Sequence, residues 1–258
     1  MDVKTTLKMA IGGVALFCAG AAATMLVTGR LPVSSALASL TGRAQIEQVV
    51  HDYLLAHPDI IVEMSNRLDS QQAAAEDKAR TDALFQIGAK ALTDPKVAYV
   101  EGPADAKITV AEFFDYRCPH CKASLGAMKN LAAQNKNVRI AFIERPILTP
   151  DSLVAAHAAV AARRQPGKYV PFHFALMQTT GELPKDRILD IAKSVGIDTV
   201  KLEKDMADPA VIEQVNQSNA LADSLHFNGT PTFVINDRIV VGEVTTEELQ
   251  ELVKDPKG

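Results

Sequence analysis

Two cysteines three positions apart, Cys118 and Cys121, constrain this chain of 258 residues more than any other feature. Residues 107–116, just before the pair, are rich in β-branched and aromatic side chains and predict a buried strand. Residues 118–134 carry apolar side chains at helical spacing. We therefore expect the pair where a strand ends and a helix begins. The pair itself fits a structural disulfide, two ligands of a metal site, or a redox centre.

The cysteine count weakens the structural interpretation. Of the three cysteines in the chain, Cys18 lies in an apolar N-terminal run, so the rest of the chain holds a single pair. A disulfide between Cys118 and Cys121 would close a very short loop and would constrain the unfolded chain little. Secreted domains that depend on disulfides spread several of them through the fold. Redox chemistry and metal binding remain.

The expected position of the pair favours a thiolate at Cys118. The first N–H groups of a helix have no partner inside the helix and carry partial positive charge. Pro119 is well tolerated at the first helical position, and His120 adds positive charge when it is protonated. These effects lower the pKa of Cys118 and make the disulfide oxidising. Cys121, one helical turn further on, is expected to lie deeper and to resolve a mixed disulfide at Cys118.

Glu112 is a further candidate catalytic residue, because it lies six residues before Cys118 on an otherwise apolar strand. A buried carboxylate at this position would have a raised pKa and could exchange a proton with Cys121. The alternative is that Glu112 points outward from an edge of the sheet.

The stretch NGTPTFVIN, residues 228–236, is a candidate substrate-binding segment. Thr230 and Pro231 open a predicted strand and fit a tight turn beside the active site. If the peptide bond between them is cis, the backbone of Thr230 could pair with an extended substrate. Chain order alone does not decide the isomer.

The N-terminus predicts export. Lys4 and Lys8 precede an uncharged run over residues 9–29, which as a helix is long enough to span the hydrocarbon core of a membrane. The run is either a membrane anchor or a signal peptide, with an A-x-A cleavage motif at residues 36–38. Residues 1–40 are assigned to this segment and a linker.

Residues 41–95 predict a helical region. Apolar side chains over residues 46–54 recur at helical spacing, and Pro58 suits the start of a second helix that is expected to run to about Leu92. The apolar stripe of the second helix is too thin to stabilise it alone. Residues 44–92 are therefore expected to pack either on their own domain or against another copy of the chain.

Residues 96–258 alternate between strands and helices. A second strand is predicted at 137–145, a wholly helical block at about 150–225, and then two strands and a final helix capped by Thr246. Without the helical block, the order is β-α-β followed by β-β-α.

On these residues, the span from Val97 to Lys254 resembles the DsbA-like thioredoxin-fold thiol–disulfide oxidoreductases. The resemblance rests on EFFDYRCPHC, on the helical insertion and on GTPTFVIN. It implies an α/β thioredoxin fold with an inserted helical subdomain, a cis-Pro231, Cys118 as the attacking sulfur, Cys121 as the resolving sulfur, and no cofactor. The implied partners are exported proteins with thiols or disulfides and a membrane redox protein that recharges the site. The implied location is the periplasm, with anchoring to the inner membrane if residues 9–29 are retained.

The helices before this domain resemble those of ScsC-type proteins, the suppressors of copper sensitivity. In that group such helices support oligomers, and some members isomerise disulfides. Thr230 before the proline is typical of isomerases, whereas the CPHC motif is typical of the oxidase. The direction of exchange therefore stays open.

Two other functions are weighed against the oxidoreductase. Cys118, His120 and Cys121 could bind copper or zinc, but three ligands are too few for a closed zinc site unless a distant histidine completes it; the candidates are His157, His173 and His226. A chaperone or scaffold role for the long helices is the third hypothesis. A net charge of −4 gives no sign of a broad nucleic-acid-binding surface.

Overall fold

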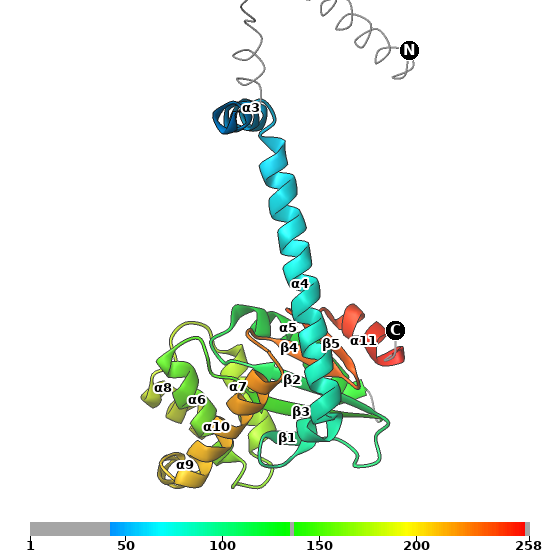
Figure 1. The fold of residues 1–258 in the computed structure, drawn as a ribbon. Helices are drawn as coiled ribbons and strands as arrows, with labels where there is room; N and C mark the ends of the chain where they lie inside the picture. The colour runs from blue at the N-terminus through cyan, green and yellow to red at the C-terminus, as the bar shows by residue number, and fades with distance from the viewer. Residues whose placement is uncertain (1–41, 135–136, 256–258) are drawn as a thin grey trace, which may run out of the picture. The chain divides into compact units, whose positions relative to one another are not determined.

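The computed structural model describes residues 42–134 and 137–255 (Figure 1). The expected anchor or signal peptide, with Cys18, lies outside these residues. The described chain falls into two compact units that divide between Ser70 and Gln71, and each is described by itself. In the described part of the chain, no helix is both long and apolar enough to cross a membrane.

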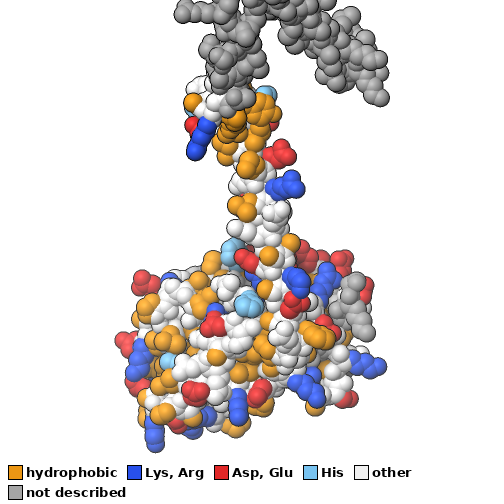
Figure 2. Space-filling view, in the orientation of Figure 1, with side chains coloured by type: hydrophobic (Ala, Val, Ile, Leu, Met, Phe, Trp, Pro, Cys, Tyr) orange, Lys and Arg blue, Asp and Glu red, His pale blue; other side chains and the backbone are white. Residues whose placement is uncertain are grey.

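The first unit consists of α3 (Arg43–Ala56) and the beginning of α4 (Asp59–Ile87). The two helices meet at His57 and Pro58, where the break was predicted. No residue of α3 is buried. Most of the larger apolar side chains of this unit are exposed, and several gather on the face seen in Figure 2. We call them the apolar set of the first unit: Ile46, Val49, Val50, Tyr53, Leu54, Leu55, Ile61, Val62, Met64 and Leu68.

The second unit is built on a five-stranded sheet with the order β1-β3-β2-β4-β5 (Figure 1). The strands are β1 (Ala98–Glu101), β2 (Ile108–Phe114), β3 (Val138–Glu144), β4 (Thr232–Ile235) and β5 (Arg238–Val241). The central strand β2 pairs in parallel with β3 and antiparallel with β4. The outer strands β1 and β5 pair antiparallel with β3 and β4.

Besides the end of α4, the described part of the second unit contains seven helices. They are α5 (Pro119–Gln134), α6 (Pro150–Ala162), α7 (Tyr169–Gln178), α8 (Lys185–Ser194), α9 (Thr199–Met206), α10 (Pro209–Ser224) and α11 (Thr246–Lys254). Helices α6 to α10 occupy the predicted helical block. The α/β thioredoxin fold with an inserted helical subdomain is thereby confirmed.

Strand β2 is buried on both faces, which explains its almost continuous apolar sequence. Val110 and Phe114 face a core shared with α5 and the helical insertion. Phe113 faces a second core, to which the end of α4 contributes Leu84 and the following 3₁₀ turn (Ala89–Thr93) contributes Leu92. The end of α4 is therefore part of the core of the second unit.

Two predicted helix boundaries are wrong. Helix α4 ends at Ile87 instead of continuing to about Leu92, because Gly88 adopts a positive φ of 82° and its N–H bonds the Leu84 carbonyl at 2.8 Å. The cap of α11 is Thr245 and not Thr246. The Thr245 hydroxyl accepts from the Glu248 N–H at 3.2 Å, and the Glu248 carboxylate accepts from the Thr245 N–H at 2.8 Å.

Candidate active site

Cys118 lies in the turn that joins the central strand β2 to helix α5. Its N–H donates to the Asp115 carbonyl at 3.1 Å, and its own carbonyl accepts from the Lys122 N–H at 3.2 Å. Pro119 is the first residue of α5, where its missing N–H costs no helical hydrogen bond. Cys118 is thus held at the N-terminal end of the helix, next to its unpartnered N–H groups.

Both thiols are buried and unoxidised in this structure. Cys118 is 3% exposed, and Cys121, inside the first turn of α5, is 1% exposed. The Cys118 Sγ donates to the backbone carbonyl of Thr230 at 3.1 Å. The peptide bond between Thr230 and Pro231 is cis. The fold therefore brings the two motifs that the sequence singled out into direct contact.

The pKa of the Cys118 thiol is lowered from its ordinary value to about 5. The largest cause is a hydrogen bond from the Cys121 thiol, and burial opposes it. The backbone N–H groups of Cys121 and His120 lower the pKa further. The helix N-terminus thus acts as expected, but its contribution comes after that of the neighbouring thiol.

The pKa of the Cys121 thiol is raised, chiefly by burial and then by its hydrogen bond to Cys118 and the charge of Glu112. A proton shared by the two sulfurs therefore belongs to Cys121, and the negative charge belongs to Cys118. This difference gives the two thiols distinct chemical characters, because the thiolate is the nucleophile and the better leaving group.

Glu112 lies in the middle of the central strand and is 2% exposed. The alternative that it points outward from a sheet edge is therefore excluded. Burial, followed by the charge of Cys118, raises the pKa of the Glu112 carboxyl to about 8. Its charge acts in turn on Cys121. A carboxyl with this pKa can accept or release a proton near neutral pH.

His120 points to solvent and pairs with an acidic residue that the sequence analysis did not identify. Its Nδ1 lies 2.9 Å from a carboxylate oxygen of Glu243, and both side chains are largely exposed. The hydrogen bond and the charge of Glu243 raise the pKa of the His120 imidazole. Glu243 follows strand β5, so only the folded sheet reveals this contact.

Lys122 is a second residue that the sequence did not reveal. Its ammonium group donates to the carbonyls of Met177 at 3.2 Å and Thr179 at 2.6 Å, at the C-terminal end of α7. A cation at this end of a helix satisfies unpartnered carbonyls and complements the helix dipole. The helix that carries the cysteines is thereby attached to the helical insertion.

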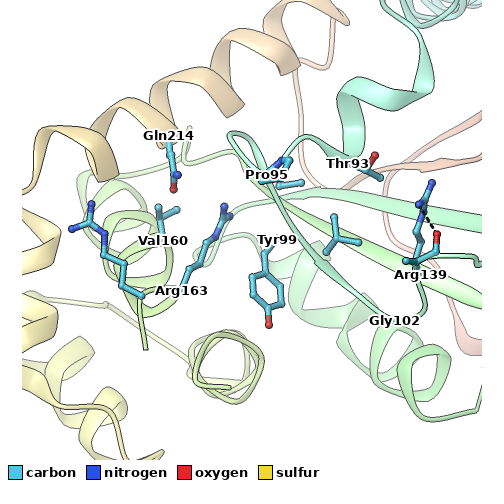
Figure 3. Close-up of a pocket in the computed structure, with 12 residues that line it drawn as sticks. Thr93, Pro95, Tyr99, Gly102, Arg139, Val160, Arg163 and Gln214 are labelled. Atoms are coloured by element: carbon cyan, nitrogen blue, oxygen red, sulfur yellow. Dashed lines mark hydrogen bonds between the residues drawn. The ribbon is translucent and has the colours of Figure 1, made fainter. Parts of the chain in front are cut away.

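A pocket of 610 Å³ lies outside this site (Figure 3). Tyr99, Arg163 and Gln214 line it, and neither cysteine nor the cis-proline does. The Arg163 guanidinium lies 5.1 Å from the centre of the Tyr169 ring, and its nitrogens have no hydrogen-bond partner among the described residues. Those nitrogens are also closed to solvent, so a ligand in the pocket could not reach them without a rearrangement.

The three distant histidines do not form a metal site with the cysteines. Within residues 42–134 and 137–255, no group of three or more His, Cys, Asp or Glu side chains is arranged to hold a metal ion. His173 packs instead against Phe114, Phe142 and Tyr169, and burial lowers its pKa to about 3.

A family model described as the DSBA-like thioredoxin domain matches residues 109–254, which is more than half of the chain. The chain belongs to this family. A second model, the copper resistance protein ScsC N-terminal domain, matches residues 43–75 of this DSBA-like protein. Both matches agree with the resemblances that the sequence suggested.

Similar solved structures support the same family assignment. A thioredoxin-like oxidoreductase from Silicibacter pomeroyi is 43% identical, with 66% of this chain and 98% of that chain covered and a TM-score of 0.62. The thiol-disulfide exchange protein α-DsbA2 from Wolbachia pipientis is 31% identical, with 71% and 98% covered and a TM-score of 0.63. Together with the family match, they support a DsbA-like thiol–disulfide oxidoreductase fold.

Part of the chain also matches a segment of a much longer curated protein. The Na(+)/H(+) antiporter NhaA 1 of Salinispora arenicola is 32% identical over 162 residues, which are 62% of this chain. The chain spans about a quarter of the length of the first curated relatives that it matches.

Proposed function

We propose that this DSBA-like protein catalyses thiol–disulfide exchange in exported proteins, with Cys118 as the attacking sulfur and Cys121 as the resolving sulfur. The observation that carries the proposal is the contrast between the two thiols. Cys118 lies beside the cis-proline with a pKa of about 5, whereas the pKa of the buried Cys121 is raised. A stable thiolate at Cys118 stabilises the reduced pair and makes the disulfide a good oxidant.

Oxidation of a substrate proceeds in two exchanges. A substrate thiolate attacks Cys118 of the Cys118–Cys121 disulfide, which breaks that bond and releases Cys121 as a thiolate. Glu112, protonated in the oxidised protein, supplies the proton that Cys121 takes up. A second substrate thiolate then attacks the substrate sulfur of the mixed disulfide and releases Cys118 as a thiolate. Two electrons pass from the substrate to the protein.

Isomerisation starts from the reduced protein. The Cys118 thiolate attacks a wrong disulfide, which forms a mixed disulfide and releases a substrate thiolate. That thiolate attacks another disulfide of the same substrate, and the thiolate released there attacks the substrate sulfur bonded to Cys118, which frees the Cys118 thiolate again. Cys121 resolves a mixed disulfide that fails to rearrange. This direction requires that a redox partner keeps the pair reduced, whereas oxidation requires a partner that removes electrons.

Thr230 and Pro231 are proposed to hold the substrate backbone. The Thr230 carbonyl accepts from Cys118 while the Cys118 sulfur carries its proton. When Cys118 is a thiolate or is bonded to a substrate sulfur, it has no hydrogen to donate. The carbonyl then becomes free to accept an N–H of an extended substrate next to its cysteine.

The proposed location is the periplasm, and the proposed partners are exported proteins with thiols or disulfides and a membrane redox protein. The apolar N-terminal run and the family support this assignment. Self-association through residues 44–92 is proposed with it. The support is the apolar set of the first unit, because a helix such as α3, which buries none of its residues, gains stability from a partner.

Refolding assays on reduced and on scrambled ribonuclease test the proposal. Cys118→Ser is expected to abolish both oxidation and isomerisation, and Cys121→Ser is expected to accumulate a mixed disulfide with the substrate, visible on a non-reducing gel. If Cys118→Ser still refolds either substrate, the assignment of the nucleophile is wrong. The ratio of the two wild-type activities decides between oxidase and isomerase.

Copper binding is the second candidate function, and the match of residues 43–75 to the ScsC N-terminal domain favours it. The two thiolates of Cys118 and Cys121 are the proposed ligands, since soft thiolates prefer Cu(I), whereas His120 points to solvent and pairs with Glu243. Titration of the reduced protein with Cu(I), with a parallel count of free thiols, tests this function. It is ruled out if the affinity is the same in Cys118→Ser.

A further inference from the structure

Asp115 is a buried carboxylate that connects three segments of the second unit. It is 1% exposed and lies three residues before Cys118. One oxygen accepts from the Arg117 N–H at 2.7 Å and from the Ser152 hydroxyl at 2.6 Å. The other accepts from the N–H groups of Ile147 at 2.9 Å and Leu148 at 3.0 Å. The turn before the nucleophile, the loop after β3 and the start of α6 thus share one acceptor group.

Only an acidic side chain fits this position. All four partners donate, and a carboxylate of this size accepts four hydrogen bonds on two oxygens. An asparagine would have to turn its NH₂ group, which only donates, toward two of these donors. Those donors would be either the two loop N–H groups or the Arg117 N–H and the Ser152 hydroxyl, and both would lose their acceptor. The sequence analysis passed over Asp115, although a carboxylate within the buried run FFDY is a signal that could have identified it.

The loop that Asp115 holds has an apolar, exposed surface. Ile147 is 39% exposed and Leu148 is 49% exposed, between Pro146 and Pro150. Their backbone N–H groups point inward to Asp115, so their side chains are fixed on the outside of the loop. No hydrogen bond other than those to Asp115 holds these two N–H groups among the described residues.

We infer that Asp115 is a positioning residue that holds residues 146–149 as a docking surface for the polypeptide bonded to Cys118. The inference rests on the proposed thiol–disulfide exchange. A substrate cysteine joined to Cys118 places its flanking residues beside the turn that Asp115 anchors, and the same carboxylate sets the position of Ile147 and Leu148. The substrate class that fits is an extended, cysteine-containing segment with apolar neighbours, as an unfolded exported protein presents.

The test compares a peptide with a small dithiol. Full-length protein oxidises either an apolar peptide with two cysteines or dithiothreitol, with glutathione disulfide as the terminal oxidant. We expect Asp115→Asn to raise KM for the peptide about fivefold or more, with kcat for the peptide, the rate with dithiothreitol and the pKa of Cys118 unchanged. Leu148→Ala is expected to raise KM by a similar factor, because it removes about 1 kcal/mol of apolar contact.

A triple variant, Asp115→Asn combined with alanine at both loop positions, identifies the route of the effect. If Asp115 acts through the loop, Asp115→Asn adds little to KM once Ile147 and Leu148 are both alanine. Ser152→Ala removes one donor to Asp115 and the acceptor for the Thr149 N–H, but it leaves the bonds of the Ile147 and Leu148 N–H groups intact, so it is expected to change KM less than twofold. Faster hydrogen exchange at the Ile147 and Leu148 amides in Asp115→Asn would show that the loop has been released.

Three outcomes would contradict the inference. The first is an unchanged peptide KM in Leu148→Ala and Ile147→Ala; because both side chains are exposed, these variants decide the question even if Asp115→Asn does not fold. The second is an equal loss of rate with the peptide and with dithiothreitol. The third is full additivity between Asp115→Asn and the two loop alanines in the triple variant. A wild type that exchanges no disulfides with either substrate would overturn the proposed function itself, and the inference with it.

Discussion

The charge on Cys118 depends first on its neighbour in the motif. The Cys121 thiol is the strongest of the donors that lower the pKa of Cys118, ahead of the helix backbone. A hydrogen bond to a charged group contributes about 1.5–3 kcal/mol, which corresponds to about one to two pKa units. The resolving cysteine therefore also tunes the attacking one.

Two substitutions at Cys121 separate the donor from the sulfur. Cys121→Ser keeps a hydroxyl donor, so we expect the pKa of Cys118 to stay near 5. Cys121→Ala removes the donor, so the pKa is expected to rise by about one unit or more. The ultraviolet absorbance of the thiolate, followed against pH, measures both. Equal values in the two variants would mean that the helix N-terminus alone sets the pKa.

Glu112 makes stability depend on pH. Its pKa is about 8 in the folded protein and 4.5 in its ordinary state, so between these values the folded state binds the extra proton. Stability from this group is therefore present in full below pH 4.5, falls as pH rises, and is lost at pH above 8. Glu112→Gln is expected to stabilise the reduced protein at pH 8 by at most about 5 kcal/mol, with little effect at pH 4.

Urea unfolding at several pH values measures this effect. Glu144 is also buried with a pKa raised to about 8, chiefly by burial, although it accepts hydrogen bonds from Tyr116 and Tyr169. Glu112→Gln should therefore reduce the pH dependence without removing it. Identical slopes for wild type and variant would show that Glu112 does not carry the raised pKa.

At the scale of elements, helix α11 depends on its capping box. Thr245→Ala removes the acceptor for the Glu248 N–H and is expected to lower the free energy of unfolding by about 1 kcal/mol. Thr246→Ala is the matched control, because Thr246 makes only a 3.4 Å contact with Asn130. Chemical denaturation of both variants measures the difference. A larger loss of unfolding free energy in Thr246→Ala would mean that Thr246 is the cap, as the sequence predicted.

Local sequence patterns predicted most elements but not their exact ends. The apolar run before Cys118 predicted β2, and the helical spacing of apolar residues after it predicted α5. Both patterns are local, because each is complete within the residues of its own element. The end of α4 depends on one glycine with a positive φ, and the cap of α11 depends on which of two adjacent threonines is extended. The backbone conformation at these two helix ends is set by how each helix packs on the rest of the fold.

The candidate site was predictable where chemistry and sequence spacing coincide, as for Cys118, Cys121 and Thr230. Asp115, Lys122 and Glu243 could not be assigned roles in this way. Each contacts groups between about thirty and over a hundred positions away in the sequence. Only the sheet order and the placement of the insertion create these contacts.

At the scale of the whole molecule, self-association is expected to depend on the first unit. Met64 is 65% exposed, and Met64→Glu adds a charge to its apolar set without disturbing a core. We expect this variant to lower the oligomeric state or to weaken association by about tenfold or more, since it buries an unpaired charge. Ser65→Glu, at the next position of α4, is the control. Sedimentation that is unchanged in Met64→Glu would exclude this surface.

A truncation that separates the two units should end before the last turns of α4. Leu84 and Leu92 are 4% and 2% exposed in the core of the second unit. Removal of residues 42–70 is therefore expected to leave that core complete, whereas removal of residues 42–92 is expected to cost several kcal/mol. Thermal unfolding of the two shortened proteins distinguishes these outcomes, and equal melting temperatures would mean that α4 contributes nothing to the core.

The distribution of aromatic residues has a practical consequence for spectroscopy. The chain has no tryptophan and four tyrosines. Tyr99, Tyr116 and Tyr169 belong to the second unit, and only Tyr53 lies in the first, where it is 55% exposed. Near-ultraviolet dichroism and intrinsic fluorescence will therefore follow the melting of the redox unit almost alone, whereas far-ultraviolet dichroism will also record α3 and α4. If the two curves separate, the helices and the redox unit unfold independently.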